Sequence, residues 1–552
     1  MSHVMTAAVL CALAGLSMAC DGRTYFVSAH GADGNIGTAD APFRTIARAC
    51  ALAAPGDTVV IRDGDYRETI RPARSGEAGR PITFEGHEGA EVRITEVDTG
   101  GDITDRSWLT FRRLSFVDCE RHWIWGTNAH HITVEECSFD NSTEDTNRWE
   151  GVGCADGSYL TIRRCRFGQW GSAARANGTK PGEVHGAGDM IRGWPCDYTL
   201  IEENDFRGAR SGHSVIAAHG HYIVIRNNVI QNLWQKGLDI GERMFRGKHV
   251  PGSHYLFENN RVSNTRLNYP EAANGGVGLQ VYSYDSIYRY NTFASNEVLG
   301  VEAGPWGDPD KGHDITPGLD NNRFYNNTFW GHGRGGMVLL SPPVRDKDTS
   351  RNAIVNSIFA GNGASPKKPE EMGVQLRMRL RNTADGYGDN WVLGNCFSGP
   401  DGNSHAVAIG DVCHDPAWCD ASDPEHFGGN IWADPRLADP AREDFSLASD
   451  SPCAGAGRDL TQTIGPGDAS RDLRLRDAAY LCDGYGLVSA DWIRIGETEP
   501  VQIQAIDYRL NVVTLVSPRT WRHGDPVNLY RDSSGNVVLR GAYPDIGAAP
   551  PR

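Results

Sequence analysis

The sequence lacks an excess of basic charge, lacks a long apolar run after its first 20 residues, and lacks any cysteine spacing typical of a zinc site. Its 54 Lys and Arg residues are outnumbered by 70 Asp and Glu residues, which gives a formal charge of −16 at pH 7. Affinity for phosphate backbones comes from basic surface, so this balance argues against a nucleic-acid-binding protein. The acidic overall charge does not exclude a local basic cleft that binds acidic sugars. No later segment is apolar enough to predict a membrane span.

The N-terminal segment, residues 1–20, has the pattern of a signal peptide. Its apolar run ends in Ser17-Met18-Ala19, a small-x-small cleavage pattern. We therefore expect a secreted or periplasmic protein. Cys20 follows directly and resembles a bacterial lipoprotein attachment cysteine, so a membrane-anchored lipoprotein is the alternative.

A phrase of a few β-forming residues, an Asn or Cys, any residue and a large apolar residue repeats along the chain. The apolar anchor is, in order, Phe116, Phe139, Phe167, Phe206, Ile230, Val262, Phe293, Phe329, Phe359 and Phe397. The gaps between anchors vary from 23 to 39 residues. A fixed phrase with elastic gaps predicts a solenoid with one coil per repeat and insertions in its turns.

The residue two places before each anchor forms a second column. It reads Leu114, Cys137, Cys165, Asn204, Asn228, Asn260, Asn291, Asn327, Ser357 and Asn395. A buried amide is costly unless paired, and amides stacked about 4.8 Å apart pair with one another. The column therefore predicts parallel coils in register. The alternative, that Asn only marks surface turns, does not explain the constant offset from the anchor.

Four cysteines carry specific expectations. Cys137 and Cys165 fall in this column on neighbouring coils, where we expect a stack of buried thiols. Cys413 and Cys419 share a loop and are close enough in sequence to form a small disulfide in an oxidising compartment.

The segment from residue 24 to 68 carries a family resemblance. It contains Tyr-Phe-Val-Ser, Gly-Ala-Asp-Gly-Asn-Ile-Gly-Thr and Gly-Asp-Thr-Val-Val-Ile-Arg-Asp-Gly-Asp-Tyr-Arg-Glu. These motifs resemble the start of secreted right-handed parallel β-helix proteins, many of which are polysaccharide lyases or glycoside hydrolases. The resemblance implies an all-β, right-handed parallel β-helix.

The chain divides into three parts. Residues 1–20 form the signal segment, residues 21–455 the β-helix with its N-terminal cap, and residues 456–552 a small C-terminal β segment. The cap is a short helix starting near Pro42, with Phe43, Ile46, Ala47 and Cys50 on its apolar face. In the C-terminal part, 501–507, 511–516 and 525–530 predict short strands, for which we expect a capping or stabilising role.

Chemistry is expected on one strand of each coil, which reads Gly-apolar-x-apolar. Aligning these strands places Asp239, Gly278, Glu302, Val338 and Gln375 in one outward-facing column. Asp239 and Glu302 are then two coils apart, roughly 9.6 Å along the axis, with Gly278 as an open floor between them. This spacing is near the upper end of the range for an inverting glycoside hydrolase, about 6.5–9.5 Å. Solvated surface carboxylates are the ordinary alternative.

A lyase needs a base and cations that neutralise a uronate carboxylate. Lys236 and Arg243 bracket the Asp239 strand, Arg192 lies two coils earlier, and Arg377 follows Gln375. Ca²⁺ held by Asp239 or Glu302 would also suit a lyase.

Aromatic, histidine and amide residues near these strands are candidates for sugar binding. They are Trp194, His213, His219, Tyr282, Trp306, Gln375 and Arg377. His219 and His221 form a pair without an evident third metal ligand. We expect a monomeric enzyme that cleaves a polysaccharide by hydrolysis or β-elimination; the alternative is a glycan-binding or structural envelope protein.

Overall fold

The computed structural model describes residues 22–141, 150–169, 188–208, 214–234, 236–241, 252–267, 275–304, 319–341, 349–365, 372–380, 385–400 and 405–548, and the backbone of 243–245 and 248–250. The expected signal segment and Cys20 lie outside these residues. Within them, no helix is long and apolar enough to cross a membrane.

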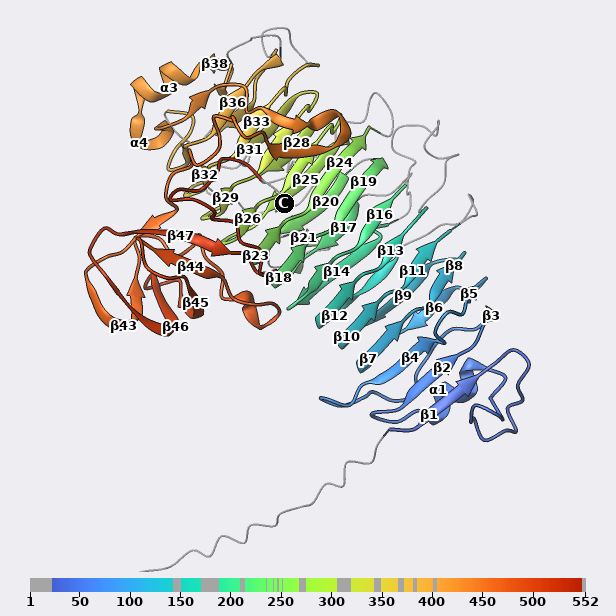
Figure 1. Cartoon of the computed structure of the whole chain (residues 1–552). Helices are drawn as coiled ribbons and strands as arrows, with labels where there is room; N and C mark the ends of the chain where they lie inside the picture. Colours follow the sequence, from blue (N-terminus) through green and yellow to red (C-terminus); the bar gives the residue numbers. More distant parts are fainter. Residues whose placement is uncertain are drawn as a thin grey trace, which may run out of the picture.

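Three stacks of parallel strands wind into one elongated body (Figure 1). The first, here called the site sheet, contains β6 (Thr99–Asp102), β9 (His122–Thr127), β12 (Val152–Arg163), β14 (Ile191–Asp197), β17 (Ser214–Ala218), β20 (Lys236–Gly241), β25 (Val277–Tyr282), β28 (Leu299–Ala303), β31 (Gly335–Leu340), β34 (Leu376–Arg379) and β37 (Val407–Ile409).

The second stack, the covered sheet, shares the long strand β12 with the first. It contains β1 (Thr24–Val27), β2 (Thr58–Ile61), β4 (Ile82–Gly86), β7 (Ser107–Arg112), β10 (His130–Glu135), β12, β15 (Leu200–Glu202), β18 (Gly220–Arg226), β23 (Gly252–Glu258), β26 (Ile287–Arg289), β29 (Arg323–Tyr325), β32 (Ala353–Val355) and β35 (Trp391–Leu393).

The third stack, the phenylalanine sheet, carries the apolar anchors. It contains β3 (Gly64–Tyr66), β5 (Val92–Thr95), β8 (Ser115–Val117), β11 (Ser138–Asp140), β13 (Arg166–Phe167), β16 (Asp205–Arg207), β19 (Val229–Trp234), β24 (Arg261–Arg266), β27 (Thr292–Ala294), β30 (Thr328–Trp330), β33 (Ile358–Ala360), β36 (Cys396–Ser398) and β39 (Ile431–Trp432). Each complete coil passes from site sheet to covered sheet to phenylalanine sheet. The predicted right-handed parallel β-helix is confirmed.

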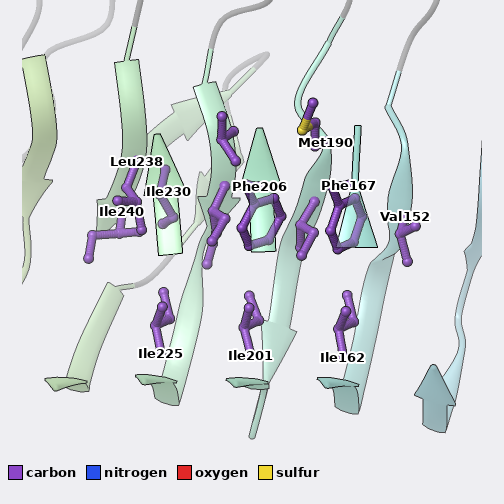
Figure 2. Packing of buried hydrophobic residues seen from close by; sticks show 14 of the residues in the cluster. Val152, Ile162, Phe167, Met190, Ile201, Phe206, Ile225, Ile230, Leu238 and Ile240 are labelled. Carbon is purple, nitrogen blue, oxygen red and sulfur yellow. The ribbon is translucent and has the colours of Figure 1, made fainter. Parts of the chain in front are cut away.

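The core is built from columns of like residues on successive coils (Figure 2). Ile162 pairs with Ile201 and Ile201 with Ile225, while Phe167 pairs with Phe206 on the facing sheet. All five side chains are buried. Because identical positions repeat along the axis, anchor rings on neighbouring coils stack on one another, as between Phe167 and Phe206 with centroids 4.5 Å apart.

The predicted asparagine ladder is confirmed. The Asn204 amide donates to Asn228 Oδ1 at 3.0 Å, Asn228 to Asn260 at 2.9 Å, Asn260 to Asn291 at 3.2 Å, and Asn291 to Asn327 at 3.1 Å. Each side-chain oxygen also accepts the backbone N–H of the preceding ladder residue, for example Asn228 N–H at 3.1 Å from Asn260. From Asn204 to Asn327, the ladder thus satisfies polar groups at the tight turn before each anchor strand.

The capping helix α1 (Ile46–Leu52) begins later than predicted. Thr45 caps it, and its hydroxyl accepts the Arg48 N–H at 3.1 Å. Ala47 is exposed and Ala49 is buried instead, so the predicted apolar face was wrong at that position. Because the helix starts at Ile46, its buried face is formed by Ile46, Ala49 and Cys50. Phe43 lies before the helix and is also buried.

The cysteine predictions have mixed outcomes. Cys137 and Cys165 are buried free thiols, as expected, and each lies within 3.6 Å of a backbone carbonyl oxygen. The disulfide expected between Cys413 and Cys419 is wrong, because both are free. Cys413 lies in β38 (Val412–His414), whereas Cys419 is buried on the helix α3 (Pro416–Ser422), which is followed by α4 (Pro424–Phe427).

The C-terminal part forms an antiparallel sheet that packs against the outer face of the covered sheet (Figure 1). Its strands are β42 (Thr461–Gln462), β43 (Gly467–Arg474), β44 (Trp492–Ile495), β45 (Val501–Asp507), β46 (Val512–Trp521) and β47 (Pro526–Arg531); the hairpin β40 (Leu437–Asp439) and β41 (Asp444–Leu447) precedes it. Leu256, Ile287 and Tyr325 supply the apolar patch that it covers.

A fully buried ion cluster joins the β-helix to the C-terminal part of the chain. Arg289 of β26 donates to both Asp491 oxygens at 2.7 and 2.6 Å and to Glu258 at 2.5 Å. Ser533 also donates to Glu258, at 2.6 Å. Burial raises the pKa of Glu258 and of Asp491, since two carboxylates share one guanidinium away from water.

Candidate functional site

The outward column of the site sheet differs from the predicted one at two positions. Asp239 pairs with Gln280, Gln280 with Glu302, Glu302 with Val338, and Val338 with Arg377. Gly278 and Gln375 therefore do not belong to this column. Asp239 and Glu302 are two coils apart as predicted, but Gln280 lies between them.

Both errors are shifts of two residues along a strand. Along a regular strand, side chains two residues apart share a face, so the Gly-apolar-x-apolar phrase matches equally well at either position. Gly278 departs from this alternation, because an added Cβ there would lie 3.2 Å from the Phe293 ring, toward the core rather than on an open floor. Gln375 is buried, where its side-chain oxygen accepts the Asn362 amide at 2.8 Å.

Lys236, Asp239, Gln280 and Glu302 form one connected cluster. The Lys236 ammonium donates to Gln280 Oε1 and lies 3.9 Å from Asp239 Oδ2. Gln280 Nε2 then donates to Glu302 Oε1 at 2.6 Å. Lys236 is 5% exposed and Asp239 0%, whereas Glu302 is partly exposed. The cluster thus extends from the buried ammonium of Lys236 to the partly exposed carboxylate of Glu302.

Tyr282 completes this cluster from the end of β25. Its hydroxyl donates to Asp239 Oδ1 at 2.7 Å. Tyr282 pairs with Gly241 of the preceding coil, which has φ of +124°. A Cβ at Gly241 would lie 2.5 Å from the Tyr282 backbone, so only glycine lets these strands approach with this geometry.

A second cluster surrounds Arg192, two coils before Asp239 in the same column, with only the methyl group of Ala217 between them. The guanidinium lies 2.6 Å from Glu150 and 3.4 Å from Asp189, and it stacks 4.1 Å above the Trp194 ring. Burial raises the pKa of Glu150. Sequence reasoning missed Glu150 and Asp189, because they lie outside the repeated phrase.

The remaining predicted residues have different surroundings. His219 is fully buried, its Nδ1 is 2.7 Å from the Gly241 carbonyl oxygen, and its ring meets Trp194 edge-on at 4.8 Å. Arg377 lies at the far end of the outward column. His213, Trp306 and the Arg243 side chain lie outside the described residues.

The described residues do not fit a calcium site at Asp239. Ca²⁺ requires six to eight oxygen ligands, and the Lys236 ammonium already lies beside this carboxylate with a charge of the same sign as the metal. Across the described part of the chain, no group of three or more His, Cys, Asp or Glu side chains is placed to hold a metal ion.

Known proteins resemble the β-helix of this chain. Residues 25–215 match the model of the Pel9A-like right-handed β-helix region. The uncharacterized protein YwoF of Bacillus subtilis (strain 168) is 26% identical over 465 residues, covering 78% of this chain and 92% of YwoF. Pectate lyase L of Dickeya chrysanthemi is 26% identical over 203 residues, and the match spans 35% of this chain and 42% of that relative.

Two solved structures also align with this chain. The complex of XylC with xylose aligns with a TM-score of 0.45 at 12% identity, covering 92% of this chain and 100% of that one. Pectate lyase Pel9A aligns with a TM-score of 0.42 at 15% identity, covering 81% and 94%. The resemblance to carbohydrate-active β-helix proteins is confirmed by the family match: this chain is a right-handed parallel β-helix whose residues 25–215 carry the Pel9A-like pattern.

Proposed function

We propose that the protein cleaves an acidic polysaccharide by β-elimination on the outer face of the site sheet. The observation that carries this proposal is the placement of Lys236 between Asp239 and Gln280, with Asp239 in the same column as Arg192. The Pel9A-like match and the similarity to pectate lyase L support a uronate polymer such as pectate as the substrate.

In this reaction Lys236 is the base. Its ammonium first releases a proton to solvent; the neutral amine then takes the proton from the carbon beside the uronate carboxyl group, and the electron pair of that C–H bond forms a carbon–carbon double bond. The bond to the glycosidic oxygen at the neighbouring carbon breaks, and that oxygen leaves with the bonding pair and takes up a proton from water. Arg192, which pairs with Glu150 and Asp189 in the free protein, neutralises the substrate carboxylate by exchanging one of these partners for it, and this favours the negative charge that develops beside it.

Hydrolysis by Asp239 and Glu302 is less well supported. An inverting pair needs space for a water molecule between its two carboxyl groups. Gln280 lies at that place, accepts a hydrogen bond from Lys236 and donates one to Glu302. Tyr282 also holds Asp239 through a hydrogen bond of 2.7 Å.

Glycan binding without cleavage is a second candidate. It is favoured by the burial of Lys236, which is 5% exposed, and of Asp239, which is 0% exposed. A reacting base must reach the substrate, so catalysis requires the outer face to open around these groups.

Substitution of Lys236 by Met tests the reaction. We expect the unsaturated uronate product formed from polygalacturonate, followed by its ultraviolet absorbance, to fall at least 100-fold, within the range for loss of a general base. Arg442→Gln, an 87%-exposed position on the C-terminal side of the chain, is the matched control. Reducing ends without the absorbance signal would favour hydrolysis, and substrate binding without either signal would favour the second candidate.

We also propose that the protein acts as an exported monomer. The signal-peptide pattern of residues 1–20 supports export. Cell fractionation of the full chain, with and without Cys20→Ala, distinguishes a released protein from a lipid-anchored one. Light scattering of the released form measures its oligomeric state.

A further inference from the structure

Two thiols meet inside the β-helix near the corner where the coils turn from the site sheet to the covered sheet. Cys154 of β12 and Cys196 of β14 lie on neighbouring coils, 42 positions apart in the sequence. Their Sγ atoms are 3.2 Å apart, and both residues are fully buried. Among the described residues, the other thiol is the only hydrogen-bond partner that each of them has.

Glycine residues provide the space in which the two sulfur atoms approach. Cys154 pairs with Gly193 on the next coil, and Cys196 pairs with Gly157 on the preceding one. A Cβ at Gly157 would lie 2.6 Å from Cys154 Sγ, so this sulfur occupies the place of the missing side chain, directly beside the strand of Cys196. At Gly193 a Cβ would lie 3.0 Å from Cys196 Cβ. The two glycines thus let the thiols touch although their backbones are offset along the strands.

The other buried thiols on neighbouring coils, Cys137 and Cys165, are engaged differently. Each donates to a backbone carbonyl oxygen 3.6 Å away, which satisfies a weak S–H donor. Cys154 and Cys196 have no carbonyl acceptor among the described residues. A disulfide bond is about 2.0 Å long, so closing the contact of 3.2 Å requires the sulfur atoms to move by only about 1.2 Å.

We propose that Cys154 and Cys196 are a disulfide-forming pair, closed in the exported protein. The oxidised state rests on the proposed export, because disulfides form and persist in oxidising compartments outside the cytosol. The two thiols give up two protons and two electrons as the S–S bond forms. The acceptor is the disulfide of an exchange partner, which is reduced to two thiols. The closed bond restricts the unfolded chain across the 42 positions between the cysteines.

The bond would join the two strands that carry the Arg192 cluster. Gly153, next to Cys154, pairs directly with Arg192. Trp194, on which the Arg192 guanidinium stacks at 4.1 Å, lies two residues before Cys196. The cross-link therefore fixes the position of the Arg192 strand relative to the preceding coil.

The chemistry of the folded pair decides how the proposal is tested. The hydrogen bond with Cys196 and the burial of the pair raise the pKa of Cys154, so in the folded protein it stays a thiol rather than the reactive thiolate. The full chain is therefore incubated with reduced and oxidised glutathione at a denaturant concentration just below its unfolding transition, where local opening admits the oxidant. Oxidised glutathione is the electron acceptor and leaves as two reduced molecules.

Peptide mapping by mass spectrometry then reads out the bond, after the remaining free thiols have been alkylated. Cys154 is the only cysteine of the tryptic peptide 149–163, and Cys196 is the only cysteine of the tryptic peptide 193–207. We expect these two peptides to be recovered linked, and to separate on reduction. Folded protein in which both peptides are recovered alkylated and unlinked would overturn the proposal.

Thermal unfolding with and without a reductant gives an independent measurement. Reduction should lower the unfolding midpoint by about 3–5 °C more in the parent protein than in Cys154→Ala, which has no bond to lose. Cys482→Ala removes a buried thiol of the C-terminal part and should keep both the linked peptides and the parent response. Equal responses of the parent and Cys154→Ala would contradict the proposal. Linked peptides after glutathione treatment, but free Cys154 and Cys196 in protein recovered from cells, would count against export alone.

Discussion

Replacing one ladder residue, Asn260→Leu, should destabilise the β-helix by about 3–5 kcal/mol. The Asn260 side chain makes five hydrogen bonds: Nδ2 donates to Ile225 O, Glu258 O and Asn291 Oδ1, and Oδ1 accepts from the backbone and side-chain nitrogens of Asn228. Each is worth about 0.5–1.5 kcal/mol, and a buried donor left without a partner costs about 1–3 kcal/mol. The buried leucine offsets part of this loss.

The assay is denaturant unfolding followed by tryptophan fluorescence, with Gln231→Leu as the matched control. Gln231 lies in β19, on the coil whose ladder residue is Asn228, and its side chain makes no hydrogen bond to another described residue. The control should change stability by no more than about 0.5 kcal/mol. If Asn260→Leu and Gln231→Leu unfold within 1 kcal/mol of each other, the ladder does not stabilise the coils as argued.

Four further predictions follow from buried charges and backbone geometry. Arg289→Met should cost about 3–5 kcal/mol in denaturant unfolding, because it leaves two buried carboxylates without their cation. The pKa of Glu258 is raised on folding, so its contribution to stability is present below the unfolded carboxyl pKa and falls as pH rises from there; Glu258→Gln should flatten that part of a pH–stability profile. Chelation with EDTA should leave lyase activity within twofold. Gly241→Ala should lower activity at least tenfold by displacing Tyr282 from Asp239, and unchanged kcat would contradict this role.

The register of the coils was predictable because it depends on the hydrogen-bonding needs of buried asparagine side chains. Asn204, Asn228 and Asn260 need partners that only the next coil supplies, and the observed ladder follows from that need. The site-sheet register was not predictable to the residue. Glycine and apolar residues recur there at a spacing of two, so the phrase fits equally well after a two-residue slip, and this exchanged Gln280 for Gly278.

The repeated phrase does not predict contacts between segments that are far apart in the sequence. Asp491 reaches Arg289 from a part of the chain that has no coil pattern, and its identity as a partner depends on how the C-terminal sheet packs. A column of turn residues, one per coil, contains Tyr198 and Tyr222; it keeps a constant offset from the anchors and could have been found by the same alignment. It escaped notice because its residue type changes from aromatic to polar along the chain.

That change of residue type coincides with the start of a cavity between the covered sheet and the C-terminal sheet. Where the column is aromatic, the ring faces pack on one another, as between Tyr159 and Tyr198 with centroids 4.8 Å apart, so those faces are not offered to a ligand. From Asp285 onward the side chains are polar and face the cavity. Burial of apolar area stabilises the packed part of the C-terminal sheet. Burying the polar side chains of Asp285, Asn321 and Arg351 without partners would cost free energy, so close packing ends where the column becomes polar.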